Sequence, residues 1–308
     1  MKINKRIKDV NSLLQGAKQI WSLMECPVNE RQVIVHNGEF HCDDVVAVAL
    51  LHLVVGDFKV IRTRDEIFFH ETPGRVVIDV GEGFFDHHGS QSNKDFCEVF
   101  IDSDGNVIDI PACGASLIAE VLEEMGLLQI GRRLENELVA ICMQDNGKTW
   151  DYKPKTSFIH EFNTVFDENR SLQDLYFEQA VEVATMVISR MIIADEADFR
   201  SEELVKSLPI DEEVVEVTPG TEWWHRLATK DSIAKFVFYK GDNETWFLQC
   251  VPETPVDRFS KRVPLPEQWT KYPPNVGNFV FCHAGRFIAG FKTREAVLLA
   301  AEEALKTS

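Results

Sequence analysis

The chain has 308 residues, of which 44% are hydrophobic and 27% are charged. This length predicts about two domains, and this balance is typical of globular proteins with real cores. The 50 acidic residues outnumber the 32 basic ones, and the net charge of -18 argues against a general duplex-binding protein. No apolar run is long enough to span a bilayer, and the seven cysteines include no C-x-x-C pair. We therefore expect a cytoplasmic protein without a disulfide framework.

Residues 1–195 alternate predicted strands with predicted helices. Short β-branched runs that end at polar residues or glycine predict strands at Gln32–Val35, Lys59–Arg62 and 76–80. Apolar residues at helical spacing predict a helical extension at the N-terminus and further helices at 45–55, 115–125, 134–143 and 172–195. Strands that alternate with helices predict an α/β fold with a doubly wound, mostly parallel sheet.

Residues 196–308 have a different pattern, which predicts a smaller α+β domain after a helical linker. Gly241-Asp242-Asn243 is typical of a hairpin turn, and Thr293 can cap a final helix. From residue 258 onward, eight basic residues outnumber four acidic ones, so this domain is the better candidate for binding a polyanion. The β-rich runs lie at 233–239, 245–251, 278–283 and 287–291.

Imidazoles and carboxylates gather at the ends of two predicted strands. His36, His41 and Asp43 follow the first strand, Asp79 closes the third, and Asp86-His87-His88 comes shortly afterwards. A carboxylate at the end of an apolar strand is costly unless it binds a cation or another partner. Because open α/β sheets bind ligands at the carboxyl ends of their strands, we expect these side chains to converge.

The types of donor predict a divalent metal site. Nitrogen and oxygen ligands without thiolate suit Mn²⁺, Mg²⁺, Fe²⁺ or Zn²⁺. One histidine in a loop is more often simply solvated, but four of the chain's nine histidines fall in these two segments. If a carboxylate bridged two ions, a hydroxide between them would be the nucleophile, and His88 would hold phosphoryl oxygens. Asp145, near the end of a predicted helix, is a further candidate, although alone it reads as part of a helix terminus.

Several stretches, spread from about residue 33 onward, carry a resemblance to a known family. They are 36–44, 77–81, Phe85-Asp86-His87-His88, Ala115-Ser116, Gln144-Asp145-Asn146-Gly147, Leu265-Pro266-Glu267-Gln268-Trp269 and 281–291. Together they resemble the DHH phosphoesterase superfamily and, more specifically, the Myg exonuclease family of melanocyte-proliferating-gene-type proteins. The resemblance implies a parallel-sheet domain, a helical linker and a smaller C-terminal domain, and a metal-dependent nuclease that acts on RNA from the 3′ end.

The resemblance also implies a role for each motif residue. Asp79 would bridge two ions, Asp86 would orient a ligand imidazole through its other ring nitrogen, and His88 would contact the scissile phosphate. These three are the predicted catalytic residues, and Mn²⁺ is the preferred cofactor, with Mg²⁺, Fe²⁺ or Zn²⁺ as alternatives. The implied metal ligands are His36, His41 and Asp79 for one ion, and Asp43, Asp79, His87 and Asp145 for the other.

Three positions bear on how closely the chain follows this pattern. His41 stands where the superfamily usually has Asp, which agrees with the Myg branch, whereas Asp44 stands where that branch commonly has Glu. Gly89-Ser90-Gln91-Ser92 replaces a more basic and aromatic continuation seen in eukaryotic relatives. These differences leave the length and identity of the substrate open.

Basic and imidazole side chains of the second domain are predicted to bind the substrate backbone, although they can also be read as ordinary loop and strand-end residues. Gly285 would let main-chain amides approach a phosphate. The predicted substrate-binding residues are His88, Arg258, Lys261, Arg262, His283 and Arg286.

Three functions remain open from the sequence. The leading one is a metal-dependent phosphodiester hydrolase, a 3′→5′ exonuclease or oligonucleotidase that acts on short single-stranded RNA. The second keeps the site but takes a small phosphoester or pyrophosphate, which the acidic charge favours. The third is an inactive metal-binding regulatory protein. We expect no membrane partner, and a homodimer is left open.

Overall fold

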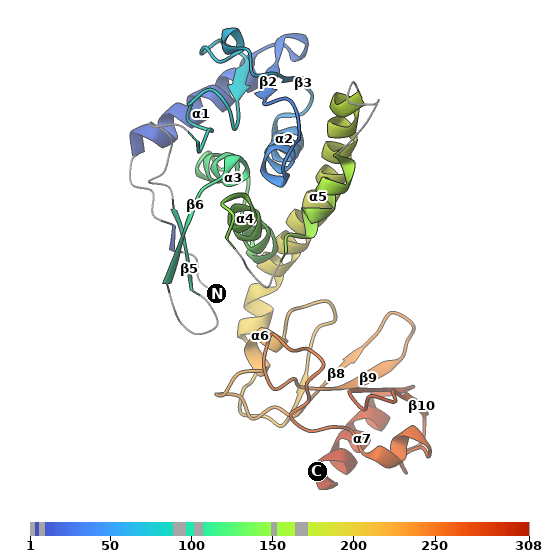
Figure 1. Cartoon of the computed structure of the whole chain (residues 1–308). Helices are drawn as coiled ribbons and strands as arrows, with labels where there is room; N and C mark the ends of the chain where they lie inside the picture. The colour runs from blue at the N-terminus through green and yellow to red at the C-terminus, as the bar shows by residue number, and fades with distance from the viewer. Residues whose placement is uncertain are drawn as a thin grey trace. The chain divides into compact units, whose positions relative to one another are not determined.

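The computed structural model describes residues 4–5, 10–88, 97–101, 107–148, 153–163 and 172–307 (Figure 1). The chain divides into two compact units, Met1–Glu196 and Ala197–Ser308. The boundary lies within helix α5, Gln173–Lys206, which therefore contributes to both units. Each unit buries its own set of apolar side chains.

A parallel sheet organises the first unit. Its strands are β2 (Gln32–Val35), β3 (Lys59–Arg62) and β4 (Arg75–Val77), in the order β3-β2-β4. The central strand β2 pairs in parallel with both neighbours, and its apolar side chains are fully buried. The chain passes from β2 to β3 on one side and then to β4 on the other. The carboxyl ends of β2 and β4 therefore form a topological switch point, where open α/β sheets bind ligands.

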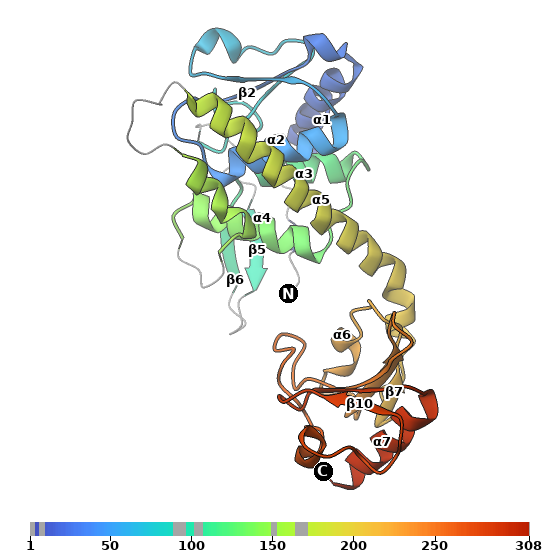
Figure 2. The ribbon, with the colours of Figure 1, turned by 90° about the vertical axis from the view of Figure 1, so that its right-hand side faces the viewer.

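Helices supply most of the core of the first unit. Ile20 and Leu23 of the N-terminal helix are fully buried, so this helix contributes to the core. The second helix is buried over most of its length because it packs against the third and fourth helices. α5 runs along the outside of this group (Figures 1 and 2). The helices are α1 (Val10–Glu25), α2 (Cys42–Val55), α3 (Gly114–Glu124), α4 (Arg132–Asp145) and α5.

Smaller elements complete the first unit. An antiparallel sheet of order β1-β5-β6 was not predicted from the sequence. The 3₁₀-helix η3 follows α4 and packs against α2. These elements are β1 (Asn4–Lys5), β5 (Cys97–Ile101), β6 (Val107–Pro111), η1 (Val28–Glu30), η2 (Glu66–Phe68) and η3 (Lys155–Phe162).

The second unit is built on a mixed sheet of order β10-β11-β9-β8-β7. The predicted hairpin is present, with β8 and β9 antiparallel, and α7 packs on the sheet. The Thr293 hydroxyl accepts a hydrogen bond from the Ala296 N–H at 3.2 Å and caps α7, as predicted. The elements are β7 (Val214–Glu216), α6 (Trp224–Leu227), β8 (Phe236–Lys240), β9 (Trp246–Cys250), η5 (Glu267–Thr270), β10 (Phe279–Cys282), β11 (Ile288–Phe291) and α7 (Arg294–Lys306).

The predicted fold class is confirmed at the level of a mixed α/β protein with a parallel sheet and several helices. The doubly wound, DHH-like arrangement is not confirmed. The predicted helix at 172–195 continues to Lys206, whose Nζ lies 2.8 Å from Oε1 of Glu202 one turn earlier. Among the helices that the structure describes, none has the length and apolar character needed to cross a membrane.

Candidate metal centre

The loop between β2 and α2 carries two imidazoles and leads into two buried carboxylates. His36 follows β2 directly, and His41 is the residue that precedes the first turn of α2. Asp43 and Asp44 lie in that turn, where the free N–H groups of a helix stabilise negative charge. Asp44 Oδ2 accepts the His41 N–H at 3.1 Å, as in a capping box. The local sequence thus places all four side chains at the carboxyl end of β2.

Asp79 reaches the same point from the neighbouring strand β4. Its φ of 53° lies in the left-handed region, which costs a non-glycine residue about 1–3 kcal/mol. The Asp79 N–H donates to Phe85 O at 3.0 Å. The Asp86 carboxylate accepts the N–H groups of Glu82 at 2.7 Å and His88 at 2.9 Å. Asp86 therefore fixes the backbone of this turn, in place of the predicted contact with a ring nitrogen.

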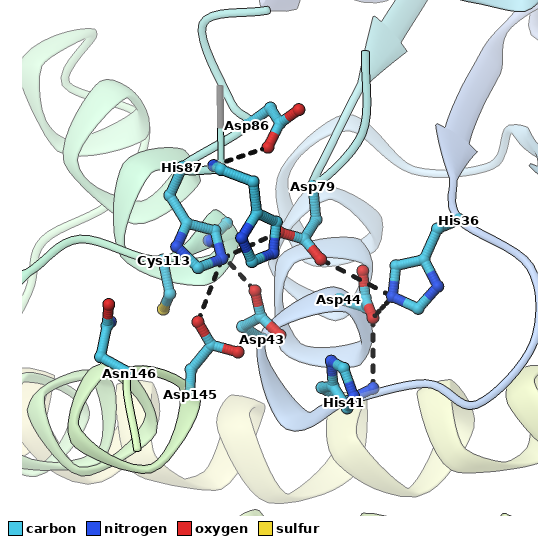
Figure 3. A network of polar contacts seen from close by, with 12 residues as sticks. His36, His41, Asp43, Asp44, Asp79, Asp86, His87, Cys113, Asp145 and Asn146 are labelled. Atoms are coloured by element: carbon cyan, nitrogen blue, oxygen red, sulfur yellow. Dashed lines mark hydrogen bonds and ion pairs between the residues drawn. The ribbon is translucent and has the colours of Figure 1, made fainter. Parts of the chain in front are cut away.

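Imidazoles and carboxylates converge on Asp79 (Figure 3). Its Oδ2 lies 3.6 Å from His36 Nε2, and its Oδ1 lies 3.0 Å from His87 Nε2 and 3.3 Å from His88 Nε2. His87 Nε2 is also 3.0 Å from Oδ2 of Asp145, at the end of α4. The two oxygens of Asp79 thus face two different groups of donors. This is the arrangement expected of a carboxylate shared by two cations.

Three overlapping groups of side chains are compact enough to hold a metal ion, since their ligand atoms lie within 4.8 Å of one another. Every ligand position predicted from the sequence is found in one of the groups. Asp44 is an addition that sequence reasoning missed, because an acidic residue at the third position of a helix is an ordinary capping residue. The groups are His36, His41, Asp44 and Asp79; Asp79, His87 and His88; and His41, Asp43 and Asp145.

In the part of the chain that the structure describes, most buried polar side-chain atoms without a hydrogen bond lie in this cluster. His87 Nε2 is close to oxygens of Asp79 and Asp145, yet without the angles of a hydrogen bond. Each unsatisfied buried atom costs about 1–3 kcal/mol. Divalent cations would satisfy these atoms, so the residues present fit metal ions. The atoms are Asp43 Oδ1, Asp44 Oδ1, Asp79 Oδ1, His87 Nε2 and Asp145 Oδ2.

The pKa values in the cluster reflect the same excess of carboxylate. Burial raises the pKa of Asp43 and of Asp44, and a neighbouring carboxylate raises each further. Burial and the charge of Asp43 raise the pKa of Asp145 to about 8. Burial favours a lower pKa for His36 and for His87, but the adjoining carboxylates outweigh it and raise both to about 9. Without metal, the site therefore holds protons that divalent cations would displace.

A sequence model of the MYG1_exonuc family, described as "Uncharacterised protein family (UPF0160)", matches residues 32–305. The chain belongs to this family. The matched region begins at β2 and contains the whole cluster of imidazoles and carboxylates. No solved structure matches the chain.

Curated members of the MYG1 group are similar to this chain over most of its length. It is 26% identical to the MYG1 exonuclease of Homo sapiens, in an alignment that covers 88% of this chain and 84% of the human protein. It is 26% identical to the MYG1 protein of Chlamydia pneumoniae, with 86% and 93% covered. The MYG1 protein C27H6.8 of Caenorhabditis elegans is 24% identical, with 88% and 94% covered. The likeness therefore includes both units.

The start of α3 and the end of α4 lie next to this cluster of side chains. The Gly114 N–H, at the start of α3, donates to Asp43 Oδ2 at 3.3 Å. A Cβ at Gly114 would lie 3.0 Å from Ile78 Cγ2, so a larger residue there would press against the Ile78 side chain. At the end of α4, the Asn146 amide donates to Cys142 O at 2.9 Å. Sequence reasoning gave neither Gly114 nor Asn146 a role in the site.

Arg262, which is predicted to bind substrate, has a guanidinium that donates to carbonyl groups of the protein. It donates to Ser232 O at 2.7 Å, to Ala234 O at 3.1 Å and to Thr229 O. Three carbonyl groups of the second unit thus share one cation. Nothing in these contacts requires a substrate, and they give Arg262 a clear part in holding the loop at 229–234.

The remaining candidates of the second unit make fewer contacts with backbone carbonyl groups. The Arg258 guanidinium lies 3.8 Å from the centre of the Trp224 ring. Arg286 has a φ of 58°, and its Nε donates to a backbone carbonyl at 2.8 Å. Lys261 and His283 hydrogen-bond to backbone groups two residues away. Contact of these residues with substrate stays a prediction.

Proposed function

We propose that this protein is a metal-dependent phosphodiester hydrolase that removes nucleotides from the 3′ end of short single-stranded RNA. The observation that carries the proposal is the buried Asp79, whose two oxygens face separate groups of imidazoles and carboxylates. The proposal is also supported by the mammalian relatives that are named MYG1 exonuclease. Such a site is suited to displacement at phosphorus.

The charge of the cluster supports a pair of divalent ions, with Mn²⁺ proposed first. The three groups contain four carboxylates, and two divalent cations would neutralise their negative charge. Bound ions would supply a nucleophile at neutral pH and neutralise charge on the phosphoryl oxygens. One ion would be held by His36, His41 and Asp79, and the other by Asp43, Asp79, His87 and Asp145.

His88 is the residue proposed to hold the scissile phosphate. Its side chain is 63% exposed, while its Nε2 lies 3.3 Å from the buried Asp79 Oδ1. Of the three imidazoles that lie within 3.6 Å of an Asp79 oxygen, only that of His88 is largely open to solvent. The Asp86 carboxylate positions it by accepting its N–H. A cationic or neutral imidazole there can donate a hydrogen bond to a phosphoryl oxygen.

A small phosphoester or pyrophosphate is the second candidate substrate, and the net charge of -18 favours it. A chain with this charge repels a long polyanion more strongly than a small one. The basic excess after residue 258 favours RNA instead. The choice between these substrates rests on how much of the second unit the substrate contacts.

A substrate comparison tests the proposal. The purified protein is loaded with Mn²⁺ and incubated with 5′-labelled RNA of several lengths, with single-stranded DNA, and with pyrophosphate. We expect a ladder of RNA products that shorten from the 3′ end. Asp79→Asn should remove the activity, whereas Asp57→Asn, an exposed aspartate just before β3, should not. Metal-loaded protein that cleaves none of these substrates would end the proposal.

A further inference from the structure

The loop that carries His36 and His41 is held by side chains from distant parts of the chain. Among the described residues, the backbone of residues 37–40 hydrogen-bonds to side chains and not to other backbone groups. Buried backbone groups need partners, so the conformation of such a loop follows from the side chains that bind it. The same conformation brings His36 and His41 to within 5.6 Å of each other, measured between ring centres.

Asn163, at the end of η3, holds the middle of this loop. Its Oδ1 accepts the Phe40 N–H at 3.0 Å, and its Nδ2 donates to Phe40 O at 2.7 Å. One amide thus pairs with both backbone groups of the residue before His41, as a neighbouring strand would. The Gln173 side chain, at the start of α5, donates to the same Oδ1 at 2.7 Å and fixes the orientation of the amide.

Arg62, at the end of β3, holds the loop from the other side. Its guanidinium donates to Gly38 O at 2.5 Å and to Asp174 Oδ1 at 2.9 Å. It lies 5.3 Å from the centre of the Phe40 ring and 4.9 Å from that of Phe177. The side chain is only 3% exposed. A buried guanidinium needs such partners, and a lysine ammonium would reproduce neither the planar stacking nor the rigid spread of the guanidinium donors.

We propose that Asn163 and Arg62 are positioning residues of the metal site, which hold the loop of residues 37–40 so that His36 and His41 can share one cation. The inference rests on the proposed function in one respect, namely that this group binds a divalent ion. Neither residue belongs to a metal group itself. They act on the ion through the backbone of Gly38 and Phe40.

The matched variants are Asn163→Asp and Arg62→Lys. Asn163→Asp keeps the volume and an oxygen acceptor but removes the donor to Phe40 O. Arg62→Lys keeps the charge but removes the stacked plane. The control is Arg75→Lys. The Arg75 guanidinium also donates to a carbonyl, Phe68 O, at 3.2 Å and lies 5.6 Å from the centre of the Phe68 ring. Its other hydrogen bonds go to the Gln32 side chain and not to the loop of residues 37–40.

Three measurements are made on each full-length variant. Hydrogen exchange of the metal-free chain reports on the Phe40 amide, and calorimetric titration with Mn²⁺ reports the number and affinity of bound ions. We expect faster exchange at Phe40 in both variants, and one of two binding events weakened ~10–100-fold, the usual effect of removing a group that orients a ligand. The other event and the Arg75→Lys control should keep wild-type values. Co²⁺ absorption spectra should change in the same two variants.

The outcomes separate this proposal from the proposed function. If the wild type binds two ions, and both variants keep wild-type affinities and wild-type exchange at Phe40, the positioning role is wrong and the function stands. If the wild type binds no divalent ion, the proposed function fails and this proposal fails with it, even when exchange at Phe40 is faster. If only one variant fails to fold, the other still decides the question.

Discussion

Binding of divalent ions should release protons from this site, and the structure sets the size of the effect. In the metal-free chain, His36 and His87 have a pKa of about 9 and Asp145 has a pKa of about 8, so all three are largely protonated at pH 7. Metal ligands must be deprotonated. Because His87 Nε2 and Asp145 Oδ2 lie 3.0 Å apart, the charge of each group affects the protonation of the other, and we expect roughly two to three protons to leave per chain at pH 7.

Calorimetry in buffers of different ionisation enthalpy measures this number directly. The observed heat of Mn²⁺ binding should change with the buffer at pH 7, with a slope of roughly two to three protons. The slope should fall as the pH is raised toward 9, where the two histidines are about half deprotonated. The apparent affinity should rise over the same range. A heat of binding that does not depend on the buffer at pH 7 would refute the reasoning.

Three further predictions concern stability. Glu137→Ala should lower the free energy of unfolding by about 3 kcal/mol in urea titration, because the buried carboxylate accepts the Lys155 N–H at 3.0 Å and the Thr156 N–H and hydroxyl at 2.8 Å each. Arg262→Ala should destabilise the second unit by about 2 kcal/mol, seen by hydrogen exchange there, whereas a role in substrate binding alone would raise KM and leave exchange unchanged. The melting temperature of the metal-free chain should fall between pH 6 and pH 9. His36, His87 and Asp145 have higher pKa values in the folded chain than in the unfolded chain, so their protonation stabilises the fold at low pH and this stabilisation is lost as they deprotonate. A melting temperature that rises over this range would contradict the prediction.

The candidate metal ligands at the ends of β2 and β4 could be predicted from the sequence because the patterns that indicate them are local. A β-branched run that ends in His36, and another that ends near Asp79, both show in a few residues of sequence. The rule that strand ends converge at a switch point then brings them together. The order β3-β2-β4 satisfies that rule.

Asn163 and Arg62 could not be foreseen in the same way. Asn163 is 123 positions away from the backbone groups of Phe40 that it binds, and an isolated asparagine after a short helix reads as an ordinary loop residue. Arg62 ends a strand whose two central residues are apolar and whose first residue is Lys59, so it reads as a strand boundary and not as a buried cation. Only the three-dimensional packing of β3, η3 and α5 against the loop reveals these contacts.

The hairpin of β5 and β6 was missed although its signal is in the sequence. Two β-branched runs flank Asp102-Ser103-Asp104-Gly105-Asn106, a composition typical of a turn. The division between the two units lies inside the continuous helix α5, between Glu196 and Ala197, and the sequence predicts a helical linker after residue 195.

The most direct test of the central claim is the metal content of the purified wild type and of Asp79→Asn, measured by plasma mass spectrometry after dialysis against Mn²⁺. If Asp79 is shared by two ions, the wild type should carry two and the variant should lose both, while Asp57→Asn keeps two. RNA cleavage should follow the metal content. A variant that retains two ions would contradict the account, because Asp79 would then bridge nothing.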